Sequence, residues 1–147
     1  MSDNPTAVLF ACTMNSVRSP IAEALLKYLH GNRIYVDSAG ARKGEIDPFA
    51  VAAMEEMGID LGRHRAKSFA DLQDTSFDLI ISLSPEAQHK AVEMTRAMAC
   101  EVEFWNIFDA TVVEGSREAR LDAYRQVRDE LFRRIKDRFP MEGTAGT

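Results

Sequence analysis

The chain has 147 residues, of which 46% are hydrophobic and 28% are charged. This length and composition suit one soluble domain that buries a single core without disulfides or a structural metal. The formal net charge is −5 and no run of five basic residues occurs, which argues against nucleic acid or an anionic membrane as a partner.

Neither a membrane span nor a secretion signal is visible in the sequence. No apolar stretch reaches the ~18 residues that cross a bilayer, and residues 2–5 lack a basic region followed by an apolar one. We therefore expect a cytoplasmic protein. The two cysteines, Cys12 and Cys100, are too few for a disulfide framework and match no zinc-ligand spacing. Free thiols are expected, and neither a metal nor a cofactor.

Strand and helix patterns alternate along the chain. In chain order the sequence predicts a strand at 6–12, a helix over 21–29, a strand at 33–38, a second helix, a strand at 77–83, a third helix, a strand at 101–105 and a last helix over 121–135. The first three helices begin at Ser19-Pro20, Asp47-Pro48 and Ser84-Pro85, where an N-cap side chain precedes a proline at the first helical position. Gly31 and Gly58 predict the ends of the first two.

This alternation predicts an α/β fold. Parallel strands with right-handed crossovers give a three-layer open sheet of four strands with helices on both faces. Residues 1–140 are expected to form one domain. Residues 141–147 are small and polar, which predicts a disordered tail.

The loop after the first strand carries the chemistry. Ligands of open α/β sheets bind beyond the carboxyl ends of strands, and here Cys12 and Arg18 are separated by five residues and followed by Ser19. Such a loop can aim backbone N–H groups and a helix N-terminus at one tetrahedral anion. The same field favours a nucleophilic thiolate. The predicted phosphate-binding residues are Thr13, Met14, Asn15, Ser16, Val17, Arg18 and Ser19.

A lone cysteine at the end of an apolar strand is more often a buried structural residue. The arginine six residues later and the helix start beside it reverse that balance and favour a functional Cys12. Arg18 would offer a planar fork to two oxygens of the anion. Ser19 could donate its hydroxyl to Cys12.

The sequence resembles the low-molecular-weight protein tyrosine phosphatase family, which includes thioredoxin-linked arsenate reductases. The likeness runs almost end to end and is strongest in VLFACTMNSVRSPIAEALL, VDSAG and FWNIFD. It implies that Cys12 attacks phosphorus, that Arg18 binds the phosphoryl oxygens and that Asp109 protonates the leaving group. It also implies that Asn15, Ser38 and His64 support the loop through hydrogen bonds.

The chain departs from that family at several positions. Met14 stands where the family has glycine, which implies a backbone conformation that side chains disfavour. Ala110 follows Asp109 where the family has proline, and Val17 replaces a second loop cysteine. Two further histidines, His30 and His89, have no counterpart and are expected on the surface.

The resulting prediction is a phosphatase that hydrolyses phosphate monoesters through a cysteinyl-phosphate intermediate. Its substrate would be a phosphorylated protein or a small phosphoester, and its oligomeric state stays open. One alternative is an arsenate reductase that uses an external thiol or glutaredoxin, because Ser84 and Ala91 stand where thioredoxin-linked members have their relay cysteines. The other is a catalytically weak oxyanion-binding regulatory module.

Overall fold

The structure, a computed structural model, describes residues 5–73, 76–96 and 98–140. Its sheet contains β1 (Ala7–Cys12), β2 (Tyr35–Gly40), β3 (Leu79–Ser82) and β4 (Glu101–Phe104). All pair in parallel, in the spatial order β2-β1-β3-β4. The chain therefore runs from β1 to β2 on one side of β1, and later places β3 on the other side of β1. This reversal makes the carboxyl end of β1 the switch point, where ligands of such sheets bind.

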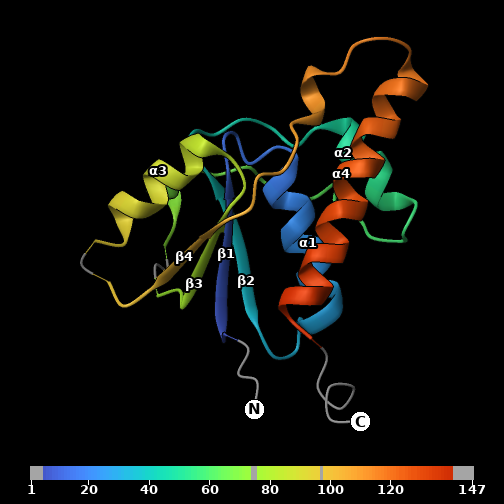
Figure 1. The fold of residues 1–147 in the computed structure, drawn as a ribbon. Helices are drawn as coiled ribbons and strands as arrows, with labels where there is room; N and C mark the ends of the chain where they lie inside the picture. Colours follow the sequence, from blue (N-terminus) through green and yellow to red (C-terminus); the bar gives the residue numbers. More distant parts are fainter. Residues whose placement is uncertain (1–4, 74–75, 97, 141–147) are drawn as a thin grey trace.

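Helices cover both faces of this sheet (Figure 1). One face carries α1 (Arg18–His30), α2 (Pro48–Glu55) and α4 (Arg117–Arg138), and the other carries α3 (Pro85–Met94). Two short 3₁₀ turns, η1 (Phe69–Asp71) and η2 (Ala110–Val112), lie in the connections. The predicted three-layer α/β architecture is confirmed.

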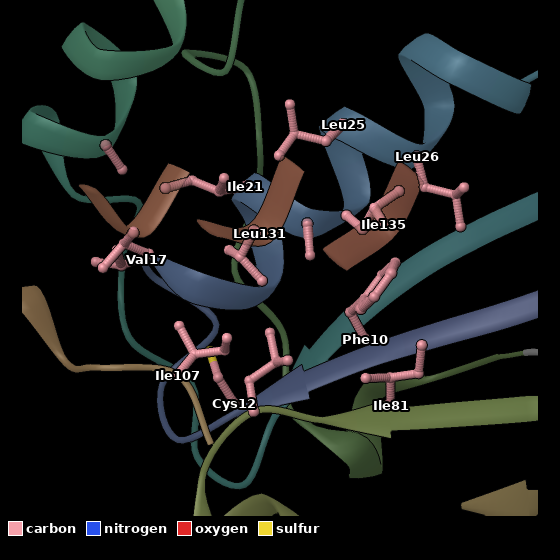
Figure 2. Packing of buried hydrophobic residues seen from close by; sticks show 14 of the residues in the cluster. Phe10, Cys12, Val17, Ile21, Leu25, Leu26, Ile81, Ile107, Leu131 and Ile135 are labelled. Carbon is pink, nitrogen blue, oxygen red and sulfur yellow. The ribbon is translucent and has the colours of Figure 1, made fainter. Parts of the chain in front are cut away.

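The core divides at the sheet because β1 is buried on both faces. Phe10 belongs to the larger cluster beneath α1 and α4, whereas Leu9 belongs to a smaller cluster with Ile80 beneath α3. Figure 2 shows Phe10 pointing toward Leu131 and Ile135 of α4 and the side chains of α1. Burial of each such side chain stabilises the fold by about 1.5–3 kcal/mol, which explains the unbroken apolar run in this strand.

Two of the three predicted helix starts are confirmed. The side chains of Asp47 and Ser84 cap α2 and α3 by accepting backbone N–H bonds from the first turn. The start predicted at Ser19 is wrong, because α1 begins at Arg18 and its N-cap is Val17, with no side-chain cap. The hydroxyl of Ser19 bonds to the cysteine of the loop instead.

The two histidines expected on the surface behave differently. His89 is exposed, but His30 is only 3% exposed, which corrects the prediction. The His30 ring bonds through Nε2 to the carbonyl oxygen of Phe139 at 2.7 Å, so that it joins the ends of α1 and α4. Gly31 follows the last residue of α1, as predicted.

Two expectations concern the membrane and the C-terminal tail. Within the described ranges, no helix combines the length and the apolar character needed to cross a membrane. The predicted disordered tail, residues 141–147, lies outside the described residues.

Candidate active site

The loop between β1 and α1 is held from outside by the segment that follows β2. The backbone N–H groups of Arg42 and Gly44 donate to the carbonyl oxygens of Thr13 and Met14 at 2.8 and 2.9 Å. Within the described residues, the backbone N–H groups of residues 14–17 donate to no protein acceptor. The loop thus turns its carbonyls toward this segment and leaves amide donors for an anion.

This close approach requires glycine at the end of β2. A Cβ atom on Gly40 would lie 2.3 Å from the carbonyl oxygen of Arg42 and 2.7 Å from the backbone nitrogen of Asn15. Both of these atoms belong to the backbone and cannot swing away. The glycine of the VDSAG stretch therefore lets β2 run against the loop.

The left-handed backbone conformation in the loop falls on Asn15 and not on Met14. Asn15 has φ 55°, and it is the one non-glycine residue with positive φ in the described part of the chain. Asparagine tolerates this region better than most side chains do. The expectation that Met14 adopts a strained conformation is therefore wrong. Its side chain is 39% exposed at the rim of the loop.

Cys12 is the last residue of β1 and is 2% exposed. Its Sγ atom lies 2.9 Å from the hydroxyl oxygen of Ser19 and 3.4 Å from the backbone nitrogen of Ser19. Figure 2 shows the sulfur at the tip of the strand, beside Ile107. Two donors at a helix N-terminus can therefore stabilise a thiolate at this position.

Arg18 occupies the first position of α1. Its Nη1 atom donates to the carbonyl oxygens of Leu83 and Ile107 at 3.3 and 3.0 Å, which fixes the guanidinium at the ends of β3 and β4. Its other N–H groups donate to no partner within the described ranges. They remain available for the oxygens of an anion.

Asp109 comes from the connection between β4 and α4. It caps η2, because its Oδ1 atom accepts from the backbone nitrogen and the hydroxyl of Thr111 at 3.0 and 2.7 Å. The next residue, Ala110, is 1% exposed and packs into the core. These contacts hold the carboxylate without the proline that the resemblance led us to expect.

The three residues predicted to be catalytic meet at one cavity of about 270 Å³. None of its described lining residues is aromatic. Asn15 and Ser19 do not line it either, so the side chains of these two predicted phosphate-binding residues lie behind the loop. The lining residues are Cys12, Thr13, Met14, Ser16, Val17, Arg18, Arg42, Asp109 and Thr111.

The predicted supporting residues Asn15, Ser38 and His64 meet beneath the loop. Asn15 donates through Nδ2 to the hydroxyls of Ser19 and Ser38, both at 2.9 Å. Its Oδ1 atom accepts from Nε2 of His64 at 3.0 Å and from the backbone nitrogen of Lys67 at 2.9 Å. Burial lowers the pKa of His64, although the carboxylate of Glu23 acts in the opposite direction.

Sequence reasoning missed Glu23, which accepts a 2.6 Å hydrogen bond from Ser38. It is 8% exposed. Its spacing of four residues from Ser19 places both on the same face of α1, toward the loop. A charged residue on the face of a helix that packs against the sheet was the signal that could have found it.

The second thiol lies far from the first. Cys100 lies directly before β4. The first residue of β4 lies beside Leu79 of β3, and Leu79 lies beside Val8 of β1, four residues before Cys12. At ~3.3 Å per residue the two cysteines are separated by roughly the length of β1, which exceeds the span of a disulfide. Burial raises the pKa of Cys100.

A parallel sheet with a Cys-x5-Arg loop at the carboxyl end of its first strand defines a class of cysteine-dependent enzymes that bind oxyanions. The chain belongs to the low molecular weight phosphotyrosine protein phosphatase family, whose model matches residues 7–142.

Individual relatives carry two kinds of name. An arsenate reductase of Halalkalibacterium halodurans is 33% identical over 135 residues, which cover 90% of this chain and 94% of the relative. A glutaredoxin arsenate reductase of Synechocystis is 28% identical over 130 residues, covering 88% and 93%. A solved structure of YwlE arginine phosphatase, a mutant with a phosphorylated active-site serine, aligns with a TM-score of 0.74 at 26% identity, covering 89% and 91%.

Proposed function

We propose that this enzyme hydrolyses phosphate monoesters with Cys12 as the nucleophile. The observation that carries the proposal is that Cys12, Arg18 and Asp109 line the same cavity. A thiolate, a cation that binds the phosphoryl oxygens and a carboxyl group that protonates the leaving oxygen are the three parts that such a reaction needs.

The proposed reaction has two steps. The Cys12 thiolate attacks phosphorus and forms an S–P bond, while the leaving ester oxygen takes a proton from Asp109. Asp109 then accepts a proton from water, which attacks phosphorus and returns the thiolate and inorganic phosphate. Arg18 and the amide donors of the loop stabilise the charge on the phosphoryl oxygens in both steps.

The lining of the cavity indicates the class of substrate. The described residues that line it include no aromatic ring, whereas Arg42 adds a second guanidinium at the rim. Arg42 is 62% exposed and pairs with Glu86 at 3.2 Å, so a substrate can compete for it. We propose a small anionic phosphoester, or an acidic phosphorylated segment of a protein, over a substrate gripped by aromatic walls.

Arsenate reduction is the second candidate, and the names of the relatives favour it. The two curated relatives described above, 33% and 28% identical to the chain, are called arsenate reductase and glutaredoxin arsenate reductase. Arsenate has the same tetrahedral shape and charge as phosphate. In this proposal the Cys12 thiolate forms an S–As bond with arsenate, and water is lost. The sulfur of an external thiol then attacks Sγ of Cys12 and forms a mixed disulfide with it. The S–As electron pair then leaves with arsenic as arsenite, and a second thiol reduces the mixed disulfide.

The two reactions are separated by assaying the purified chain with para-nitrophenyl phosphate, with aliphatic anionic phosphoesters, and with arsenate plus glutathione and glutaredoxin. Phosphate release that Cys12→Ala abolishes and Asp109→Asn greatly slows supports the phosphatase. Arsenate-dependent thiol oxidation without ester hydrolysis supports the reductase. Cys100→Ala is the matched control and keeps either activity. An inert chain that still binds phosphate would indicate the regulatory module instead.

A further inference from the structure

A buried chain of hydrogen bonds links Cys12 to a carboxylate that the proposed reaction leaves unused. Cys12 Sγ contacts Ser19 Oγ, which contacts Asn15 Nδ2, which in turn contacts Ser38 Oγ, each at 2.9 Å. Ser38 Oγ then lies 2.6 Å from Oε1 of Glu23. The first three polar residues behind the sulfur are fully buried, so each hydrogen must be placed on a partner within this chain.

The middle of the chain has a fixed direction. The backbone N–H of Lys67 donates to Oδ1 of Asn15 at 2.9 Å, and a backbone N–H can only donate. The amide of Asn15 is therefore oriented with its oxygen toward Lys67. Its two N–H bonds point to Ser19 and Ser38, and both hydroxyl oxygens act as acceptors there.

The carboxylate of Glu23, at the other end of the chain from Cys12, fixes the donors and acceptors of the remaining hydrogen bonds. A carboxylate only accepts, so the hydroxyl of Ser38 donates to Glu23 while its oxygen accepts from Asn15. Ser19 likewise accepts from Asn15, and the remaining partner for its hydroxyl hydrogen is Cys12 Sγ. Charge-assisted bonds are the strong members of such a series and polarise the bonds beyond them.

We propose that Glu23 is a positioning residue. Its carboxylate keeps the Ser38 hydroxyl donating away from Asn15, so that the Ser38 oxygen accepts from Asn15. Together with the backbone N–H of Lys67, this keeps Asn15 donating to Ser19, whose hydroxyl then donates to Cys12. This inference rests on the proposed role of Cys12 as the nucleophile. It assigns no contact with substrate to Glu23, which lies beneath the loop and does not line the cavity.

The second oxygen of Glu23 explains why a carboxylate is needed. Oε2 accepts from Nζ of Lys27 at 2.5 Å while Oε1 accepts from Ser38, so the side chain serves two donors with two oxygens. A glutamine has one oxygen and one amide nitrogen. Lys27 would take the oxygen, and the nitrogen would face Ser38, whose hydroxyl hydrogen would then lose its acceptor.

Other charged groups near Glu23 must be accounted for in any pH measurement. Nδ1 of His64 lies 3.8 Å from Oε1 of Glu23, and Asp60 lines the small cavity beside it. Lys67 pairs with Asp37 at 2.9 Å, and both charges act on the pKa of His64. Histidine is the residue type among them whose ordinary pKa lies nearest neutral pH, so a His64→Gln background, which keeps a donor for Asn15, serves as a control.

The test measures the pH dependence of Cys12 alkylation by iodoacetamide in Cys100→Ala proteins, which leaves one thiol to react. We expect Glu23→Gln to raise the pH midpoint of the rate by roughly half a unit to one unit, the effect of weakening one hydrogen bond to the thiolate. Glu130→Gln is the matched control. It removes a similar carboxylate, paired with Arg134 four residues later on α4, and leaves the midpoint unchanged.

A second substitution shows whether the shift comes from the lost acceptor for Ser38 or from altered packing around residue 23. Adding Lys27→Met to Glu23→Gln frees the glutamine oxygen to turn toward Ser38, and the midpoint should return toward the wild-type value. An unchanged midpoint in Glu23→Gln, or a shift that Lys27→Met does not reduce, would overturn the proposal. If Glu23→Gln does not fold, Ser38→Ala breaks the same link, and an unchanged midpoint there would overturn it equally.

Alkylation requires no turnover, so this test is independent of the proposed reaction. A shifted and rescued midpoint in a protein that neither hydrolyses phosphoesters nor reduces arsenate would contradict the proposed function alone. Normal turnover with an unshifted midpoint would contradict the role of Glu23 alone.

Discussion

Replacing Asn15 by alanine or by glycine separates two contributions that this residue makes to stability. Both variants lose the amide that joins Ser19, Ser38, His64 and the backbone of Lys67. Two donors then lose the acceptor that they have in the structure, Nε2 of His64 and the backbone N–H of Lys67. At about 1–3 kcal/mol for each buried group left without a partner, we expect both variants to lower the free energy of unfolding by about 2–6 kcal/mol. Alanine must also adopt φ near 55°, where it is disfavoured.

The difference between the two variants isolates that backbone term. We expect Asn15→Gly to be more stable than Asn15→Ala by about 1 kcal/mol, measured by urea denaturation with equal slopes. At Arg133, which is exposed and lies inside the C-terminal part of α4, the same pair of substitutions should give the opposite order, because alanine favours helix over glycine by about 1 kcal/mol. An Asn15→Ala protein as stable as Asn15→Gly would show that the left-handed backbone at this position carries no such cost.

Three further predictions concern ionisable side chains. His30→Ala should lower the free energy of unfolding by about 1–3 kcal/mol, because the carbonyl of Phe139 loses its donor; an unchanged urea midpoint would contradict this. Burial lowers the pKa of His64 in the folded protein below 6.5, so on acidification the imidazole is protonated in the unfolded chain at a higher pH than in the folded one. The free energy of unfolding should therefore fall as the pH drops below about 6.5. In His64→Gln this part of the pH dependence should disappear. The carboxylate of Asp78 accepts three hydrogen bonds from Thr6 and Ala7, which lower the pKa of Asp78 below 3.8. Asp78→Ala should therefore lower the free energy of unfolding by about 1 kcal/mol at neutral pH. This difference from the wild type should close as the pH falls below 3.8. A gap that persists in acid would argue against the last of these.

Local sequence patterns predicted the order of strands and helices and the position of the loop. These features depend on residues close together in the chain. Apolar runs mark strands buried on both faces, and Asp47 and Ser84 cap helices through bonds to the next turn. The spacing of Cys12 and Arg18 is local as well, so the loop could be recognised before its geometry was known.

Features set by distant contacts could not be predicted in this way. Ser19 resembles an N-cap in sequence, but its hydroxyl bonds to Cys12 and the helix begins one residue earlier. His30 resembles a surface residue, but it is buried, and Phe139, the residue that follows α4, supplies a carbonyl to its ring. The burial of Glu23 depends on partners that arrive from later parts of the chain.

The position of the left-handed residue shows a different limit. The resemblance predicted strain at Met14 from the glycine that the family has there, whereas the backbone places positive φ at Asn15. Asparagine satisfies this position by its own conformational tolerance and by its buried amide bonds. A family pattern identifies the loop but not which of its residues bears the unusual conformation.

The proposed reaction depends above all on a covalent bond between Cys12 and the oxyanion that it receives. Its most direct test is to quench the enzyme with acid during turnover of para-nitrophenyl phosphate and to locate the phosphoryl group by peptide mass spectrometry. We expect a phosphoryl group on Cys12 in the wild type, with neither label nor turnover in Cys12→Ala. Turnover that persists in Cys12→Ala, or a phosphoryl group found only on another residue, would contradict it.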